Sequence, residues 1–331
     1  MVAALLQYSA LAVFYSLLAT AMLEALLRLW RVQDPPLAAA FRLPILALPP
    51  AAPLLFPLLS PNWGTDPFRQ QWALLQLRNW LGPEPSISHP GWVLLLGTLA
   101  ATTLVLLGLE AAGHWRQLLR RPRDARGPLP LPRRLLDART RLEARGAHPF
   151  SIQLSNRPDP TACAVGLRHP TVLLTTALVD MLDDEELEAV IAHELAHVRR
   201  RDNWLGWLLL GLRLVSFYNP VAWLTFHRIG HDMESVCDAE AGRVTGKPLA
   251  LASALLKVYR ASRASHHGST IRPRWAAGRA AALENRARRA LIEDRLKRLV
   301  HPEQVPPASY PRLRLLLASA SVVATMSLVV Y

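Results

Sequence analysis

Two histidines and a glutamate lie close together in His193-Glu194-Leu195-Ala196-His197. On a helix, side chains four residues apart project from the same face, so His193 and His197 can bind one metal ion. Glu194 lies about 100° further around such a helix, where it can take a proton from a water at the metal without binding the metal itself. This spacing is typical of zinc peptidases, in which the two histidines are ligands and the glutamate is the general base.

The pattern predicts a zinc-dependent endopeptidase with Zn2+ as its cofactor. Bound zinc lowers the pKa of its water towards 7 and polarises the scissile carbonyl. Glu194 would take the proton from that water and pass it to the leaving amine. The alternative is a membrane transducer that binds zinc for structure or has lost catalysis. The intact Glu194 argues against it, because a structural zinc site has no use for that carboxylate.

The residues around the motif predict the elements that must position it. Asp183 is a good N-cap, and Glu186 three residues later completes a capping box. Apolar residues then recur at helical spacing through the motif; they are Leu187, Val190, Ile191, Leu195 and Val198. Before this helix, short β-branched runs at Ser151–Ser155, 162–166 and 171–176 predict a small sheet.

A zinc site needs a third protein ligand and an open fourth position. Asn203 stands six residues after His197, where metzincins have a histidine, so that ligand pattern is excluded. Further on, Glu234 and Asp238 are four apart and share a helix face. Glu234 can be the third ligand, and Asp238 can orient a ligand histidine through its second ring nitrogen. The competing candidates for the third ligand are His231, His227 and Glu240.

Long apolar runs predict that the chain is a multi-pass membrane protein. Hydrophobic residues make up 51% of its 331 residues. The runs place three transmembrane spans at about 2–27, 43–59 and 91–112 and a fourth within 312–331. The second run is the weakest because it contains five prolines, and a re-entrant or broken segment is its alternative.

Arginines give the orientation. They gather between the first two spans, after the third and before the fourth; they are Arg28, Arg31, Arg42, Arg116, Arg120, Arg121, Arg123, Arg126, Arg312 and Arg314. With four spans these groups lie on one side, which the positive-inside rule makes cytoplasmic. Both termini and the loop 62–90 are then extracytoplasmic. We therefore expect a mostly α membrane protein with about four transmembrane helices and a cytoplasmic α+β metallopeptidase domain, 114–311, containing a small sheet.

Three segments of the predicted domain stand out. The apolar stretch 204–226, interrupted at Arg213 and at Asn219-Pro220, predicts a hydrophobic helical hairpin against or in the membrane, with domain core as the alternative. Residues 262–274 have no hydrophobic period and predict a mobile loop. Residues 290–299 predict an amphipathic helix, to which we assign no catalytic role.

Charge and cysteine content narrow the class of protein. The net charge of +13 suits anionic lipid and an inside-facing domain, and no basic recognition motif predicts direct binding of nucleic acid. The two cysteines, Cys163 and Cys237, are too few for a disulfide framework. We expect Cys237 to be a free buried thiol and Cys163 to lie in the core.

In the order of these elements, the chain resembles the BlaR/MecR-type membrane metallopeptidases. The most specific shared features are Arg200-Arg201-Asp202 after the second histidine, the hairpin end at 217–220, and Glu234 followed by Cys237-Asp238. The resemblance implies a gluzincin-type site with His193, His197 and Glu234 as zinc ligands and Glu194 as the catalytic acid/base. It also implies a regulated signalling protease that cleaves a small winged-helix repressor, itself, or both.

The sequence departs from this resemblance in one respect. Antibiotic-sensing members have an extracytoplasmic penicillin-binding domain after the fourth span, whereas this sequence ends at Tyr331 and has no Ser-x-x-Lys nucleophile motif. We therefore do not expect β-lactam sensing. The alternative class is the HtpX-type quality-control peptidases, which share the HExxH motif and a downstream glutamate. We expect a protein substrate to add to the edge of the sheet at 162–166, unless that strand is internal; a homo-oligomer is left open.

Overall fold

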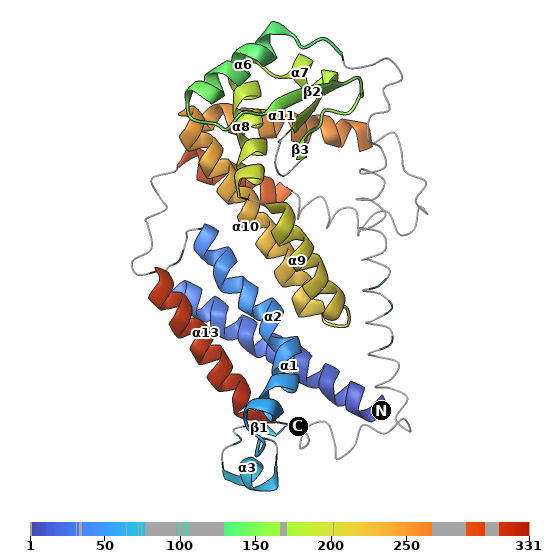
Figure 1. Cartoon of the computed structure of the whole chain (residues 1–331), viewed down its shortest axis with the longest axis vertical. Coiled ribbons are helices and arrows are strands. Elements are labelled where there is room, and N and C mark those ends of the chain that lie inside the picture. The colour runs from blue at the N-terminus through green and yellow to red at the C-terminus, as the bar shows by residue number, and fades with distance from the viewer. Residues whose placement is uncertain are drawn as a thin grey trace. The chain divides into compact units, whose positions relative to one another are not determined.

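The structure is a computed structural model of the whole chain (Figure 1). It describes residues 2–30, 32, 35–63, 65–71, 73, 75–76, 97, 101, 104, 129–165, 171–200, 202–266, 289–301 and 311–330. This part of the chain is mostly helical with a small sheet, as predicted. It divides into two compact units. The first unit is Met1–Leu119, Trp207–Met233 and Pro306–Tyr331, and the second is Arg120–Gly206 and Glu234–Val305.

Three helices form most of the first unit. They are α1 (Val2–Leu29), α2 (Pro35–Leu59) and α13 (Pro311–Ser327), and they pack against one another around apolar side chains. Tyr15, Phe41 and Met326 are fully buried there. The short helix α3 (Asp66–Gln71) precedes β1 (Leu75–Gln76), which pairs in parallel with β5 (Val329–Val330).

Two helices in the described part are long and apolar enough to cross a membrane, over Tyr8–Leu29 and Leu37–Leu59. They correspond to the first two predicted spans. The second is one continuous helix despite Pro44, Pro49, Pro50, Pro53 and Pro57, so the chain is not broken there. A continuous helix is possible because α1 and α13 pack along α2 and support it where the prolines remove backbone donors.

The other two predicted spans are not established. Residues 91–112 lie outside the described residues except for 97, 101 and 104. The last span corresponds to α13, whose 17 residues cover about 26 Å at 1.5 Å per residue, short of the roughly 30 Å of a bilayer core. Four spans, and the domain boundaries drawn from them, therefore stay predictions.

The predicted hairpin is formed by α9 (Asp202–Val215) and α10 (Pro220–Thr245). In this hairpin, polar side chains are buried and large apolar side chains are exposed, which is the reverse of the arrangement in a soluble domain. Arg213, Ser216 and Asn219 are buried, and the Asn219 amide donates a 2.6 Å hydrogen bond to Ser16 Oγ on α1. The exposed side chains are instead large and apolar; they are Leu208, Leu214, Val215 and Leu224. This polarity favours contact with lipid over the alternative of domain core.

The second unit contains the predicted sheet, with strand order β2-β4-β3. β2 (Ser151–Ser155) runs parallel to β4 (Thr171–Thr175), and β3 (Ala162–Val165) is antiparallel to β4. Within the described residues β3 is thus an edge strand, as predicted for the substrate-binding strand. Cys163 on β3 is exposed, so the prediction that this thiol is in the core was wrong: Ala162 and Ala164 face the core, and the side chain between them projects from the other face of the sheet.

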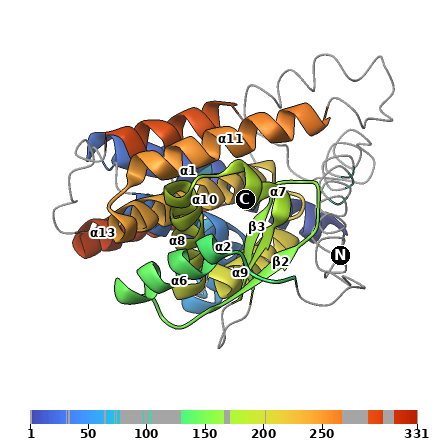
Figure 2. The same ribbon diagram turned by 90° about the horizontal axis from the view of Figure 1, so that it is seen from above.

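Helices complete the second unit, as Figure 2 shows. They are α6 (Arg133–Ala144), α7 (Thr176–Met181), α8 (Asp184–Arg199), the part of α10 from Glu234 onwards, α11 (Pro248–His266) and residues 289–300. Both α6 and α11 pack against α8 around buried apolar side chains such as Leu135, Leu187 and Leu251. Residues 262–266 continue α11, so the loop predicted from 262 was placed too early; its remainder lies outside the described residues.

The start of α8 is fixed by the predicted capping box. Asp183 accepts hydrogen bonds from the backbone N–H groups of Glu185 and Glu186, and the Glu186 carboxylate accepts one from the backbone N–H of Asp183. Ser253 and Lys257 of α11 also donate to Glu186, each at 2.6 Å. The cap therefore joins α8 to α11 as well as satisfying its first backbone donors.

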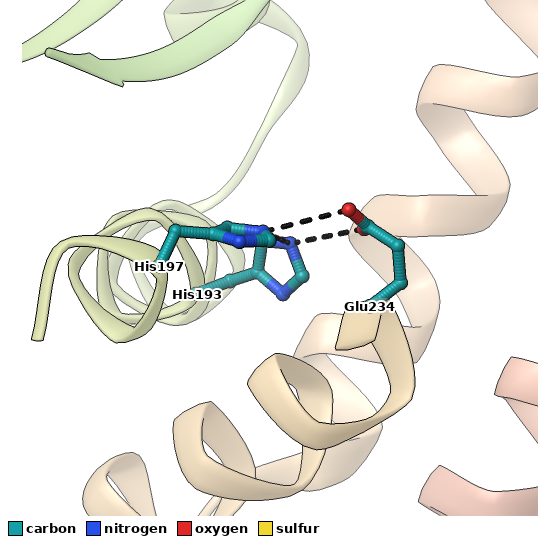
Figure 3. A group of neighbouring side chains, drawn as sticks. All are labelled: His193, His197 and Glu234. Carbon is teal, nitrogen blue, oxygen red and sulfur yellow. Dashed lines mark hydrogen bonds and ion pairs between the residues drawn. The ribbon is translucent and has the colours of Figure 1, made fainter. Parts of the chain in front are cut away.

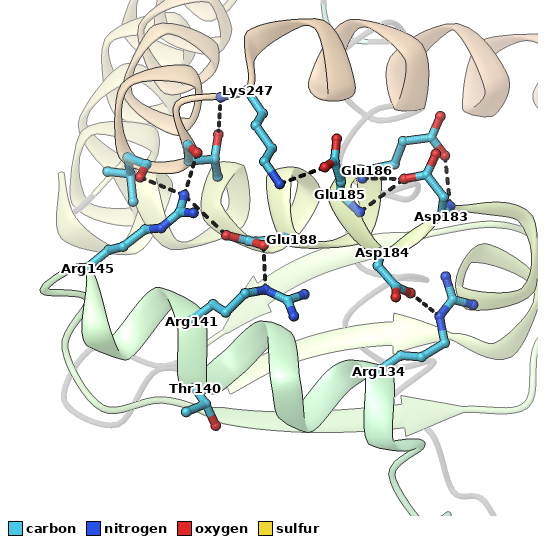
Figure 4. A network of polar contacts seen from close by, with 12 residues as sticks. Arg134, Thr140, Arg141, Arg145, Asp183, Asp184, Glu185, Glu186, Glu188 and Lys247 are labelled. Atoms are coloured by element: carbon cyan, nitrogen blue, oxygen red, sulfur yellow. Dashed lines mark hydrogen bonds and ion pairs between the residues drawn. The ribbon is translucent and has the colours of Figure 1, made fainter.

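A second set of ion pairs joins the other side of α8 to α6 (Figure 4). The carboxylate of Glu188 is buried and lies 2.7 Å from Arg141 Nε and 3.3 Å from Arg145 Nη1. Arg134 pairs with Asp184 one turn earlier. A buried carboxylate needs such partners, because it would otherwise lose its hydration without compensation. These contacts fix the rotation of α8 about its axis, and hence the face on which its histidines project.

We expect the substitution Asp183→Ala to lower the free energy of unfolding by about 1 kcal/mol, because two backbone donors lose their acceptor. Asp183→Ser keeps an acceptor oxygen and should recover most of that loss. The measurement is the thermal unfolding midpoint of the full chain in detergent. Equal midpoints for both variants and the wild type would show that the cap does not stabilise α8.

Candidate metal centre and active site

Three side chains converge at one point in the second unit (Figure 3). His193 and His197 project from α8, and Glu234 reaches them from α10. The two Nε2 atoms are 3.2 Å apart, and Glu234 oxygens lie 3.5 Å from His193 Nε2 and 3.6 Å from His197 Nε2. Among the described residues, these three form the group with the geometry of a metal site, and their ligand atoms all lie within 4.8 Å of one another.

The distances between these atoms fit zinc. In a tetrahedral site with bonds of 2.0–2.1 Å, ligand atoms are about 3.3 Å apart. The three distances here, 3.2, 3.5 and 3.6 Å, lie close to that value. The side chain of His193 is 9% exposed, while that of Glu234 is 40% exposed, so the group is closed on one side and open on the other. Two imidazoles and one carboxylate around an open position are the ligands of catalytic zinc sites.

None of the competing candidates for the third ligand joins this group. The carboxylate of Glu240 lies 2.8 Å from Arg199 and 2.8 Å from Arg243. The ring of His227 packs edge-on against Trp223, with 4.3 Å between ring centroids. His231 is also outside the group. The structure thus brings Glu234 to the histidines, which sequence spacing alone had left open.

Asp238 lies where a residue that orients His193 should be. Its Oδ1 is 2.9 Å from His193 Nδ1, on the side of the ring away from Glu234. Asp238 is in turn held by Arg295, which donates two hydrogen bonds of 2.6 and 2.7 Å to its carboxylate. Arg295 Nη1 also lies 3.2 Å from Glu234. One guanidinium therefore contacts both carboxylates that face the histidines.

Arg295 is a residue of this site that no pattern in the sequence singled out. It lies in the helical segment 289–300, which was predicted as an amphipathic helix without a catalytic role. Asp238 is 57 residues away in the chain, so no local spacing connects the two. The only signal was an arginine in an amphipathic helix, which is common on protein surfaces.

Opposite charges determine the ionisation of the group. Burial opposes a charge on His193, but the carboxylates of Asp238 and Glu234 outweigh it and raise its pKa to about 9. Burial also opposes the charges of these two carboxylates. Arg295 and His193 nevertheless hold the pKa of Asp238 below its ordinary value, and His193 and Arg295 do the same for Glu234. Both carboxylates are therefore anionic at neutral pH, as a cation site requires.

Glu194 has a different environment. Burial raises its pKa above the ordinary value, and the nearby charge of Glu234 adds to that rise, while the two histidines oppose it. The backbone N–H of Ala164 on β3 donates a hydrogen bond to it. Glu194 thus lies at the edge strand and next to the histidines. A raised pKa brings a carboxylate closer to the range in which it both accepts and donates a proton.

Comparison with known proteins identifies related chains. A family model described as BlaR1 peptidase M56 matches residues 88–288. The Protease HtpX homolog of Acidiphilium cryptum is 30% identical over 146 residues, covering 34% of this chain and 51% of the relative. Protease HtpX of Legionella pneumophila is 29% identical over 215 residues, covering 51% of this chain and 76% of the relative.

A third relative is the methicillin resistance mecR1 protein of Staphylococcus aureus. It is 28% identical over 82 residues, covering 25% of this chain and 14% of the relative. The chain spans about half the length of the HtpX homologs of Acidiphilium cryptum and Thermococcus kodakarensis, 51% and 49%, and much less of mecR1. HtpX proteins are the more frequent relatives.

We expect zinc affinity to rise with pH up to about 9, because zinc must displace the proton that His193 holds up to that pKa. One displaced proton corresponds to a tenfold gain, about 1.4 kcal/mol, per pH unit between about 7 and 9. In the metal-free protein, the stability that His193 contributes to the fold changes with pH in the opposite direction. The pKa of His193 is raised above its unfolded value of roughly 6.5, so its stabilising contribution is full below that value and is lost as the pH rises through 9.

The measurement is the zinc dissociation constant in metal-buffered solutions across this pH range. Asp238→Asn is the matched variant, because loss of the carboxylate lowers the pKa of His193. The zinc affinity of this variant should therefore stop rising at a lower pH than that of the wild type. A wild-type affinity that is flat between pH 7 and 9 would contradict the assignment.

We expect Arg295→Ala to weaken zinc binding about 10- to 100-fold, the usual cost of removing a partner that orients a metal ligand. Arg295→Lys keeps the charge but cannot donate two hydrogen bonds to Asp238, so it should recover only part of the affinity. The control is Arg298→Ala on the same helical segment, where the arginine pairs with Asp294 at 3.0 Å. Equal losses for Arg298→Ala and Arg295→Ala would indicate a general effect of the segment.

Proposed function

The chain belongs to the BlaR1 peptidase M56 family, and from this premise we propose that it is a membrane-associated zinc endopeptidase that cuts proteins at the His193–Glu194–His197 site. The observation that supports this most strongly is the convergence of His193, His197 and Glu234 at distances that fit a tetrahedral zinc ion. In this proposal the three residues are the ligands. Zinc, when bound, supplies an acidified water and a Lewis acid for the peptide carbonyl.

The chain's own residues supply the proton transfers and the geometry. Glu194 takes a proton from the attacking water and delivers it to the leaving amine. Its raised pKa and its place beside the histidines suit it to this role. Asp238 orients His193, and Arg295 holds Asp238 and Glu234 in place. The position of Glu194 argues against a zinc-binding transducer without catalysis, since Glu194 lies beside the histidines but is not needed to hold the metal.

We propose that the substrate binds as an extended peptide along β3. This strand has an open edge in the part of the chain that the structure describes, and the N–H of Ala164 on it reaches Glu194. A peptide that adds to this edge forms main-chain hydrogen bonds and lies beside the proton-transferring carboxylate. The arrangement gives affinity without requiring a particular side chain, so a protein segment in extended conformation is the expected substrate class.

For the biological role we propose a signalling protease whose catalytic region faces the cytoplasm and cleaves a winged-helix repressor, itself, or both. The supports are the BlaR1-type family match and the similarity to mecR1. A second candidate is turnover of damaged membrane proteins, as expected for an HtpX-type enzyme. It is favoured by the match to 76% of the Legionella pneumophila HtpX chain. Both roles use the same catalytic site.

We expect Glu194→Gln to retain zinc and to lower the rate of proteolysis about 100- to 10,000-fold, the usual contribution of a general acid/base. Zinc content and cleavage would be measured together on the detergent-solubilised full chain, with the chain itself and any repressor encoded beside its gene as substrates. A Glu194→Gln protein that cuts as fast as the wild type would refute the role of Glu194.

The two biological roles differ in what Glu194→Gln causes in cells. In the signalling role, the repressor persists and its target genes stay silent, while misfolded membrane proteins are removed normally. In the quality-control role, misfolded membrane proteins accumulate and repressor abundance does not change.

A further inference from the structure

Both histidines of the proposed metal site direct Nε2 towards Glu234, and the Nδ1 atom of each lies near another residue of α10. For His193 this nitrogen, Nδ1, lies 2.9 Å from Asp238. For His197 it lies 3.4 Å from the sulfur of Cys237, the residue before Asp238. A contact of 3.4 Å is within hydrogen-bonding range of a sulfur atom. The thiol is fully buried, with 0% exposure.

We propose that Cys237 is a positioning residue for His197: its sulfur accepts the hydrogen bond from Nδ1–H and so keeps Nε2 free to bind the metal. This inference rests on the proposed zinc site. An imidazole that binds a metal through Nε2 carries its proton on Nδ1, and a partner for that proton fixes both the tautomer and the ring orientation. The two histidines thus have one partner each, and the partners are neighbours on α10.

Helix geometry explains why these partners lie where they do. Residues three and four positions after Glu234 share its face of α10, and these are Cys237 and Asp238. A single helix face therefore provides the third ligand and a partner for each histidine. The sequence had predicted roles for Glu234 and Asp238 of the E-x-x-C-D pattern, and this proposal adds a role for Cys237 between them.

Charge explains why one partner is a thiol. Asp238 is a buried carboxylate, but two hydrogen bonds from Arg295 compensate its charge. A second buried carboxylate at position 237 would add to the negative charge of Glu194, Glu234 and Asp238 without an arginine of its own. A neutral sulfur can accept a hydrogen bond there without that cost. His197 is then the ligand with the weaker acceptor behind it.

The alternative is that Cys237 is only a small apolar side chain that fills space, the usual role of a buried cysteine. The two roles predict opposite orders for two variants. If the sulfur is an acceptor, Cys237→Ala should weaken zinc binding about 10- to 100-fold, and Cys237→Ser, which restores an acceptor, should bind within a few-fold of wild type. If it only fills space, Cys237→Ser should bind zinc no better than Cys237→Ala, because it buries a hydroxyl.

The experiment measures zinc dissociation constants by chelator competition on the purified full chain in detergent, together with the unfolding midpoint of each metal-free variant. Cys163→Ala removes the other, exposed thiol and should leave the zinc dissociation constant unchanged. Loss of affinity in Cys237→Ala with recovery in Cys237→Ser supports the proposal, whatever the unfolding midpoints. Equal affinities of wild type and Cys237→Ala, or no recovery in Cys237→Ser, would overturn it.

Two further results separate this proposal from the proposed function. If the wild type binds no zinc, the zinc site and the role of Cys237 both fail. If the wild type binds zinc and cleaves protein while Cys237→Ala does so equally well, only the role of Cys237 fails. Cobalt substitution tests direct ligation: a sulfur-to-cobalt charge-transfer band that disappears in Cys237→Ala would make Cys237 a ligand and overturn its role as the partner of Nδ1.

Discussion

Two imidazole nitrogens 3.2 Å apart, with a carboxylate 3.5 Å away, form an arrangement that fits a bound cation, and the second unit is organised around this group. The histidines come from α8 and the carboxylate from α10, so neither helix forms the group alone. The capping box and the pairing of Glu188 with Arg141 hold α8 from two sides, with the histidines further along the helix. Rigidity of this kind lets a site bind a metal without reorganising.

The residues around the histidines must also balance their charges. Glu194, Glu234 and Asp238 bring three carboxylates close to the histidines, and without compensation they would repel one another in a half-buried site. Arg295 compensates Asp238 and Glu234 through direct contacts, while Glu194 is left with a raised pKa. This group therefore contains two kinds of carboxylate: two that are held anionic beside the histidines, and one whose raised pKa suits the proposed proton transfer.

Local sequence patterns predicted what depends on local geometry. The cap at Asp183, the three strands and the histidine face of α8 follow from spacing within one element, and the structure has them all. Contacts between distant elements could not be predicted in this way. Arg295 is brought to Asp238 from 57 residues away. Glu234 was one of several candidates for the third ligand, and only the packing of α10 beside α8 distinguishes it from the others. The exposure of Cys163 depended on which face of β3 meets the core, which the sequence of this four-residue strand does not specify.

Zinc X-ray absorption on the purified full chain tests whether His193, His197 and Glu234 hold a zinc ion. The expected spectrum has two imidazole nitrogens at about 2.0–2.1 Å and oxygen from a carboxylate and solvent at about 2.0–2.2 Å. His197→Ala should remove one imidazole from that shell. A spectrum that His197→Ala leaves unchanged would place the zinc elsewhere, and a sulfur at about 2.3 Å would add a ligand outside this set of three.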